Sequence, residues 1–249
     1  MLGYWWKHLS WQKTRTAWRE KAEAWRRFWA SFHSYADLAS PQSAPSMKLL
    51  YPCLGDNTAT TFIEPTYFYQ DAWAFESIIA NHPALHVDVG SHHTFVALLS
   101  KVVPVTMVDI RPLSLPMSTL TFRQGSILDL PYDDNSVISV SSLCVVEHIG
   151  LGRYGDPLDP HGTEKAILEL KRIIKPGGML YLSVPLDNEN NVYFNAHRAF
   201  TESYLKEQFE PFEIIQKRYI YGSTFGEEKK TGFGVGCFQL KKRLLQGGG

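Results

Sequence analysis

The sequence predicts an α/β fold around a parallel sheet, and three observations within Gly125–Pro185 predict it. Two apolar runs, Val137–Val146 and Met179–Val184, have the length of buried strands rather than of helices. A helix-like segment, Glu164–Ile174, separates them and stops at K-P-G-G, where proline cannot continue a helix and the paired glycines suit a turn. Strand, crossover helix and strand in this order form the βαβ unit of a parallel sheet.

The segments on either side continue the same pattern of short strands and helices. A helix is expected within Phe62–Ala80, before the sheet begins, and another at Thr94–Ser100. No internal repeat interrupts the series. The further strands expected are Leu85–Val89, Val102–Ile110, Thr119–Arg123, Phe212–Tyr221 and Val235–Lys241.

The first 39 residues differ from the rest of the chain. They contain six of the seven tryptophans, and residues 1–32 carry a charge of +5, which leaves −5 on the remainder. An aromatic residue recurs every seven positions, which predicts one face of an amphipathic helix. Aromatic and basic side chains together suit an anionic membrane surface. The alternative is that this face packs on the rest of the chain or on a second copy of it. The recurring residues are Trp11, Trp18, Trp25 and Phe32.

A linker rich in Pro and Ser is expected at residues 40–60, before a domain that spans residues 61–246. The formal net charge of zero does not indicate a nucleic-acid partner. Three widely spaced cysteines make neither a disulfide framework nor a zinc ribbon, so a cytoplasmic location is expected. No run of about 18 apolar residues predicts a membrane-spanning helix.

Several separated motifs resemble, in the right order, the class I S-adenosylmethionine-dependent methyltransferases, in particular the type 11-like group. They are the turn H-V-D-V-G-S, the segment G-S-I-L-D-L-P-Y-D-D-N-S and the segment L-K-R-I-I-K-P-G-G-M-L-Y-L-S-V-P, and they lie within about Leu85–Pro185. The resemblance implies a Rossmann-like, doubly wound, seven-stranded sheet, mostly parallel with an antiparallel last strand. It also implies S-adenosylmethionine as cofactor.

The same resemblance assigns candidate cofactor-binding residues. Asp88 and Gly90 match the Asp-x-Gly of the family's first motif, although His92 stands where the family has a second glycine. Asp109 ends the second strand, 21 residues after Asp88, where an acidic residue can accept both ribose hydroxyls. The remaining candidates are Ser126 and Ile127, expected beside the adenine, and Ser142, expected beside the methionine end.

The residues after the fourth strand are expected to handle the acceptor. His148 is the first candidate for the general base that removes a hydroxyl proton, with Asp187 and His161 as further candidates. His148 can instead serve only to order its loop. The insert that follows is dense in Gly, Pro, Asp and His, as in a poorly characterised methyltransferase-like subfamily. A divalent metal on His148, Asp156, Asp159 and His161 is an alternative, although their spacing fits no known ligand signature.

These observations predict a methyltransferase acting on the oxygen of a hydroxylated acceptor, such as a sugar or glycan. Two alternatives remain. The chain can be a non-catalytic binding protein with a methyltransferase fold, or a methyltransferase of another small molecule. Its N-terminal helix is expected to contact a membrane peripherally, at the inner face, or to form a homo-oligomer.

Overall fold

The computed structural model describes residues 3–113 and 115–244, with side chains from residue 17 onward. The chain divides into two compact units, Met1–Phe62 and Ile63–Gly249. The first unit contains the long helix α1 (Gly3–Leu38) and the short 3₁₀ helix η1 (Met47–Leu49). Of the predicted aromatic face, Trp11 lies outside the residues whose side chains are described. No helix in the described part of the chain combines the length and the hydropathy needed to span a bilayer.

The second unit is built on an eight-stranded sheet with the order β3-β2-β1-β4-β5-β10-β8-β9. β1, β2, β3, β4 and β5 pair in parallel, whereas β10 runs antiparallel between β5 and β8. The predicted mostly parallel, doubly wound fold is therefore confirmed, with the short β9 as one strand more than the seven expected. The strands are β1 (His86–Val89), β2 (Val105–Asp109), β3 (Leu120–Gln124), β4 (Val137–Leu143), β5 (Ile174–Leu186), β8 (Phe212–Tyr221), β9 (Thr224–Gly226) and β10 (Gly234–Lys242).

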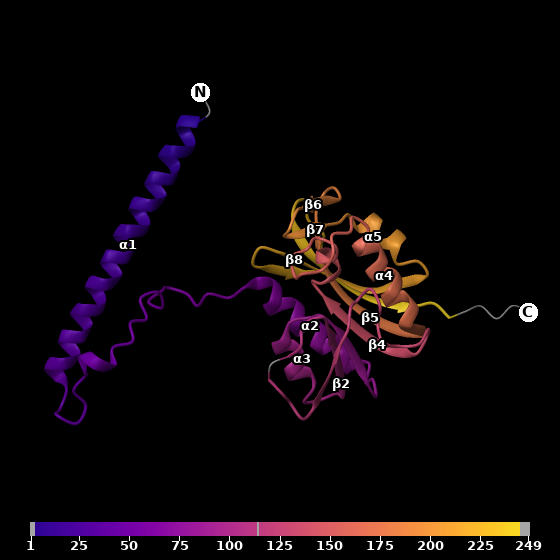
Figure 1. Ribbon diagram of the computed structural model, residues 1–249, viewed down its shortest axis with the longest axis horizontal. Coiled ribbons are helices and arrows are strands. Elements are labelled where there is room, and N and C mark those ends of the chain that lie inside the picture. The colour runs from indigo at the N-terminus through magenta and orange to yellow at the C-terminus, as the bar shows by residue number, and fades with distance from the viewer. Residues whose placement is uncertain (1–2, 114, 245–249) are drawn as a thin grey trace, which may run out of the picture. The chain divides into compact units, whose positions relative to one another are not determined.

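Helices cover both faces of this sheet (Figure 1). α2 (Pro65–Ala80) and α3 (His93–Leu99) pack on one face, and α4 (Gly162–Ile173) and α5 (Glu202–Gln208) pack on the other. A separate two-stranded hairpin consists of β6 (Asn191–Tyr193) and β7 (His197–Ala199). Successive residues of the central strands enter alternate cores, as the period of two of a strand requires. In β5, for example, Leu180 and Leu182 pack with α4 while Tyr181 packs with α2.

Among the predicted strand boundaries, those at the start of β5 and at the end of β4 are wrong. β5 begins at Ile174, directly after α4, so K-P-G-G belongs to the start of the strand rather than to a turn. The pairing of β4 with β5 shifts register between Val137 and Ser139, which accommodates these extra residues as a bulge. β4 ends at Leu143 instead of Val146, because Cys144 has a φ of +53° and breaks the extended chain.

Candidate active site

A cavity of about 340 Å³ lies where the carboxyl ends of β1, β2 and β4 meet. Ligands of doubly wound folds bind at this edge of the sheet, and the volume lies within the roughly 300–1,000 Å³ of small-molecule sites. A second hollow of about 570 Å³ adjoins it. Six residues line both: Gly90, Asp109, Arg111, Cys144, His148 and Tyr154.

Gly90 allows the chain to turn tightly out of β1. Its φ is +73°, a conformation that residues with a Cβ rarely adopt. A Cβ built there would lie 3.0 Å from Cγ1 of Val145, so any side chain would press on the wall of the cavity. His92, where the family has its second glycine, packs against the rings of Tyr67 and His93 at 5.0 and 4.3 Å between centroids. This aromatic stack lines the second hollow.

Three of the predicted cofactor residues do line the cavity on its other side. Asp109 ends β2, and its carboxylate accepts a hydrogen bond of 2.8 Å from the Arg111 backbone N–H, which orients it at the strand end. Ser126 and the buried Ile127 follow β3 and form the neighbouring wall. The hydroxyl of Ser126 accepts a hydrogen bond from the Leu128 N–H at 3.1 Å. This side of the cavity therefore pairs the Asp109 carboxylate with the apolar surface of Ile127.

The other two predicted cofactor residues do not line either hollow. Asp88 is fully buried inside the sheet, where its carboxylate accepts hydrogen bonds from the Ser91 N–H at 3.1 Å and the Ser141 hydroxyl at 2.5 Å. Ser142 is also buried and donates to the Val89 carbonyl at 3.2 Å. Both residues lie one position before the end of their strands, where the elements packed on the sheet bury them. Their expected contact with the cofactor is thus corrected to a structural role.

His148 ends a short 3₁₀ helix, η2 (Val146–His148), directly after β4. Its Nδ1 lies 2.7 Å from the Ala196 carbonyl oxygen, which can only accept, so Nδ1 carries a proton. Nε2 is then the proton acceptor of the neutral ring. Burial, the largest cause, lowers the pKa of His148 to about 4. The ring is therefore neutral at pH 7 and can accept a proton from a substrate.

Glu147 lies beside this histidine, with Oε1 3.8 Å from Nε2 of His148. The side chain is almost fully buried, and burial raises its pKa to about 8. At neutral pH both groups are uncharged, so the contact is not an ion pair. Its Oε2 has no hydrogen-bond partner within the described structure. Sequence analysis missed Glu147, although it directly precedes the candidate base.

The other two candidate bases lie away from both hollows. The carboxylate of Asp187 accepts hydrogen bonds from the Asn188 N–H at 2.7 Å and the Tyr193 hydroxyl at 2.9 Å. These bonds lower its pKa, which makes it a poorer base. His161 is exposed at the N-terminal end of α4. The structure therefore leaves His148 as the only one of the three at the cavity.

The insert after His148 is a well-defined loop. Asp156 orders it by accepting hydrogen bonds from the Gly150 N–H at 2.7 Å and the Tyr154 N–H at 3.2 Å. Arg198 is buried and donates to the carbonyls of Ile149 and, farther along, Asp159. Arg198 belongs to β7, so the hairpin and the insert are joined beside His148.

The insert places an aromatic ring at the cavity. The guanidinium carbon of Arg111 lies 4.6 Å from the centroid of the Tyr154 ring, and that ring meets the His148 ring edge-on at 5.5 Å. Arg111 was missed by sequence analysis, although its position two residues after Asp109 was a usable signal. The contact with Tyr154 was not predictable, because it joins β2 to a loop more than 40 residues away.

The alternative metal site does not form among the residues that the structure describes, since no group of three or more His, Cys, Asp or Glu side chains there can hold an ion. The carboxylate of Asp156 is used by backbone amides of its own loop. Asp159 is paired with Lys165 at 2.6 Å.

Comparisons with known proteins identify the fold. A family model described as "Caenorhabditis protein of unknown function, DUF268" matches residues 132–243, which is less than half of the chain. No curated protein sequence matches.

Solved structures are similar over 70–75% of this chain. The N-methyltransferase NodS from Bradyrhizobium japonicum WM9 matches with a TM-score of 0.54 at 12% identity, covering 72% of this chain and 98% of that one. The 1,6-didemethyltoxoflavin-N1-methyltransferase of Burkholderia thailandensis, with S-adenosylhomocysteine bound, matches with a TM-score of 0.53 at 14% identity, covering 75% and 93%. The [4+2]-cyclase SpnF matches with a TM-score of 0.51 at 13% identity, covering 70% and 82%. At such low identities these matches establish the class I methyltransferase fold, not the reaction.

Proposed function

We propose that this chain is an S-adenosylmethionine-dependent methyltransferase that methylates an oxygen of a hydroxylated acceptor. One observation carries the proposal. A single cavity combines a strand-end carboxylate, Asp109, with a close-approach glycine, Gly90, and a neutral histidine, His148. This combination supplies both a nucleoside site and a base.

The lining of the cavity fits the proposed cofactor. Val108, Ile127 and Leu128 present apolar surface to an adenine ring. The Asp109 carboxylate can accept hydrogen bonds from two ribose hydroxyls. When bound, the cofactor supplies a methyl group already activated by its positive sulfur. The chain's own residues then have to orient the acceptor and hold its proton.

In this proposal His148 holds that proton. Its Nδ1 donates to Ala196, so the ring cannot rotate without breaking this bond, and Nε2 takes the hydroxyl proton as the oxygen attacks. A sugar or glycan acceptor accords with the polar loop around Tyr154 and Arg153. The Arg153 guanidinium stacks on the Tyr154 ring at 5.1 Å and donates to the Ala196 carbonyl at 3.0 Å. Aromatic rings beside hydrogen-bond donors suit the apolar and hydroxylated faces of a sugar.

A non-catalytic or different role has one specific observation in its favour. His92 and its aromatic neighbours stand where the methyltransferase pattern has a glycine. The similar fold of a protein named as a [4+2]-cyclase shows that this architecture does not by itself dictate methyl transfer.

Calorimetric titration with S-adenosylmethionine and S-adenosylhomocysteine separates these readings first. Micromolar binding is expected of a methyltransferase, and absence of binding to either compound contradicts the proposal. Screening activated sugars and oligosaccharides with a methyl-labelled cofactor then tests the acceptor. Transfer only to amines or carbon acids would contradict O-methylation while leaving methyl transfer intact.

A further inference from the structure

A chain of buried hydrogen bonds runs along β1 and β4 towards their carboxyl ends, on the face of the sheet that α2 and α3 cover. His86, at the start of β1, is completely buried. Its Nδ1 lies 2.8 Å from the hydroxyl oxygen of Ser139, and its Nε2 lies 2.8 Å from that of Ser141. Both serines belong to β4, and Ser141 in turn donates to the carboxylate of Asp88. No step of the proposed reaction uses these groups.

The direction of this chain follows from counting protons. The hydroxyl of Ser141 has one proton and gives it to the Asp88 carboxylate, so its oxygen must accept from Nε2 of His86. His86 therefore carries its proton on Nε2, and its Nδ1 accepts from the Ser139 hydroxyl. Every donor points towards Asp88. Such a one-way chain stabilises a buried negative charge, because each polarised bond strengthens the next.

The far end of the chain reaches the second hollow. The other carboxylate oxygen of Asp88 accepts the Ser91 N–H, and the Ser91 hydroxyl accepts the Leu143 N–H at 3.0 Å. Gly90, Ser91 and Leu143 all line the second hollow. The charge on Asp88 therefore anchors the turn after β1 to the end of β4.

We propose that Asp88 is a positioning residue. Its charge, stabilised by the Ser139–His86–Ser141 hydrogen bonds, holds the Gly90–Ser91 turn in its binding conformation. Protonation of Asp88 reverses the donor and acceptor roles of every hydrogen bond in this chain. The effect on binding rests on the proposed cofactor site. When Asp88 takes a proton, it becomes a donor to Ser141. Ser141 then donates to Nε2 of His86, and the proton of His86 moves to Nδ1. The imidazole stays neutral in both states, and one proton enters at Asp88.

The groups around Asp88 place this reversal in an accessible pH range. Burial raises the pKa of Asp88 to about 6, against the lowering effect of its bonds from Ser141 and Ser91. Burial lowers the pKa of His86 to about 3, so the ring is uncharged throughout. Two other titratable groups interact with Asp88. Asp109 on β2 raises the pKa of Asp88. Asp88 in turn raises the pKa of Asp71 on α2. Asp71 has a pKa of about 6 as well and needs its own control.

Imidazole ¹⁵N spectra between pH 5 and 8 test the chain without any ligand. His86, assigned by the loss of its signals in His86→Gln, should be protonated on Nε2 at pH 7.5. It should change to Nδ1 with a midpoint near pH 6, in line with the Asp88 pKa. In Asp88→Asn the amide donates to Ser141, so His86 should carry its proton on Nδ1 at every pH. Ser141→Ala should remove the pH dependence, and Asp71→Asn should leave it intact. A His86 ring with the same tautomer at pH 5 and 7.5 in the unmodified chain overturns the proposal.

Affinity for S-adenosylhomocysteine tests the positioning role. It should fall about 10-fold or more from pH 7.5 to pH 5, as expected for losing a charge-assisted anchor. Asp88→Asn should show the low affinity at both pH values, whereas Asp71→Asn should keep the step. Equal affinities of Asp88→Asn and the unmodified chain would overturn this role. If the unmodified chain binds no S-adenosylhomocysteine at any pH, the proposed function fails, and the ¹⁵N spectra alone decide on the reversible chain.

Discussion

Asp88 and Asp109 lie near the carboxyl ends of two neighbouring parallel strands, yet they face different surroundings. Asp109 is the last residue of β2 and borders the cavity, whereas Asp88 lies one residue inside the end of β1 and is fully buried. In the register of the two strands Asp88 pairs with Met107, so Asp109 lies two residues farther towards the carboxyl edge of the sheet, on the same face. The position along the strand, not the residue type, makes one a candidate ligand and the other a support.

Replacing Asp109 tests its contact with the cofactor. Asp109→Ala should weaken binding of S-adenosylhomocysteine by about 2–4 kcal/mol, because a carboxylate accepting two hydroxyl protons is lost. Asp109→Asn keeps an acceptor for the Arg111 N–H and loses only the charge. Calorimetry on both variants separates the two roles. If Asp109→Asn binds S-adenosylhomocysteine about as tightly as the unmodified chain, Asp109 acts only by ordering the loop after β2. If Asp109→Ala also binds with unchanged affinity, the residue does not belong to the site.

Replacing His148 tests the base. His148→Asn retains a donor to the Ala196 carbonyl but has no proton acceptor like Nε2. Turnover should fall by about 10²–10⁴-fold, while affinity for S-adenosylhomocysteine stays unchanged. With saturating cofactor, turnover of the unmodified enzyme should fall as the pH drops through the His148 pKa of about 4, because only the neutral ring accepts a proton. Normal turnover in His148→Asn would contradict the assignment.

Single residues were predictable where their position in the chain sets their place in the fold. Asp109, Ser126 and His148 directly follow or end parallel strands, so their arrival at one edge of the sheet follows from the topology. The orientation of Ser142 was not predictable, because a period-2 pattern is uninformative in a strand buried on both faces. The hydrogen bonds of His86 were not predictable, because its two serine partners lie more than 50 positions away in the sequence.

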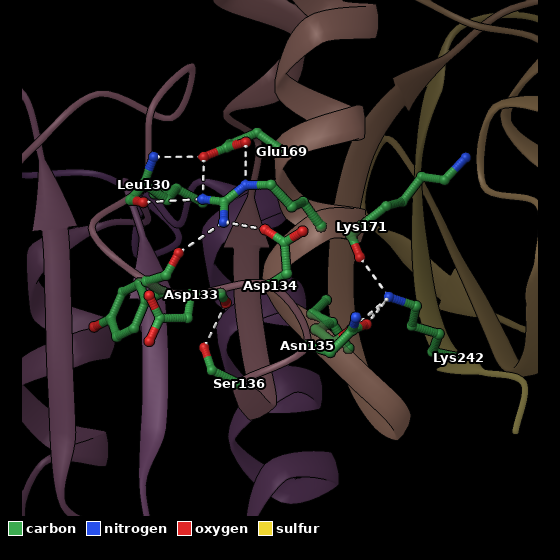
Figure 2. A network of polar contacts seen from close by, with 11 residues as sticks. Leu130, Asp133, Asp134, Asn135, Ser136, Glu169, Lys171 and Lys242 are labelled. Carbon is green, nitrogen blue, oxygen red and sulfur yellow. Dashed lines mark hydrogen bonds and ion pairs between the residues drawn. The ribbon is translucent and has the colours of Figure 1, made fainter. Parts of the chain in front are cut away.

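The segment Leu130–Ser136, with the sequence L-P-Y-D-D-N-S, joins β3 to β4. Hydrogen bonds hold it against α4 (Figure 2). Arg172 of α4 donates to the carbonyls of Leu130 and Tyr132 at 3.1 and 2.8 Å. It also pairs with Glu169 through Nη2 at 2.6 Å and Nε at 2.8 Å, a two-point contact that fixes the guanidinium plane. The loop motif is thus explained by the helix residue that it binds.

Removing the hydrogen bonds of Arg172 should destabilise the second unit. Arg172→Ala removes the donor to two loop carbonyls and leaves the partly buried Glu169 with only the Leu130 N–H, and should lower the free energy of unfolding by about 2–3 kcal/mol. Arg172→Lys keeps the charge but lacks the planar guanidinium group, so its free energy of unfolding should lie between those of the unmodified chain and Arg172→Ala. The exposed Lys175→Ala is the surface control. Urea unfolding measures all three, and a loss below about 0.5 kcal/mol in Arg172→Ala, the range of ordinary surface changes, would contradict the prediction.

The acid dependence of stability should change in the same variant. The Arg172 guanidinium lowers the pKa of Glu169, so the stabilisation is present above the unfolded-state pKa of Glu, about 4.3. It is lost as the pH falls through the lower folded-state pKa. Unfolding free energies measured from pH 7 to pH 3 should therefore fall less steeply in Arg172→Ala than in the unmodified chain.

Elements differ in how well the sequence specifies them. β8 begins and ends where its apolar pattern predicts, at Phe212 and Tyr221. The start of β5 does not, because Pro176 and the glycines after it indicate a turn and are accommodated by a bulge instead. No strand was expected at β6 or β7, since strands of three residues are too short to show a pattern. Its contacts with His148 and the insert are tertiary and carry no local signal.

At the scale of the whole molecule, the parallel βαβ pattern and the order of the motifs were sufficient for the fold class, and the strand order was not readable from periodicity. β10 inserts between β5 and β8 and pairs with both over nearly its full length. That placement depends on long-range pairing of residues far apart in the chain. Family resemblance, not residue spacing, supplied the expectation of an antiparallel last strand.

The division into two units makes the N-terminal segment separable. We predict that a chain of Ile63–Gly249 folds and binds S-adenosylhomocysteine with unchanged affinity, because every residue lining the cavity lies within this unit. The helix α1 exposes Trp18 and the basic Arg26 and Arg27 in the first unit. The full chain should therefore co-sediment with vesicles containing anionic lipid, and the truncated chain should not.

Charge reversal provides the matched control for this helix. Arg26→Glu with Arg27→Glu keeps the aromatic residues and should weaken vesicle binding, as should raised salt, because the attraction to anionic lipid is electrostatic. Uncharged vesicles should bind the full chain less well for the same reason. If vesicles bind neither chain but light scattering shows that truncation lowers the oligomeric mass, α1 joins copies of the protein instead. If Ile63–Gly249 fails to fold, the helix belongs to the core of the domain, and the proposed independence of the two units is wrong.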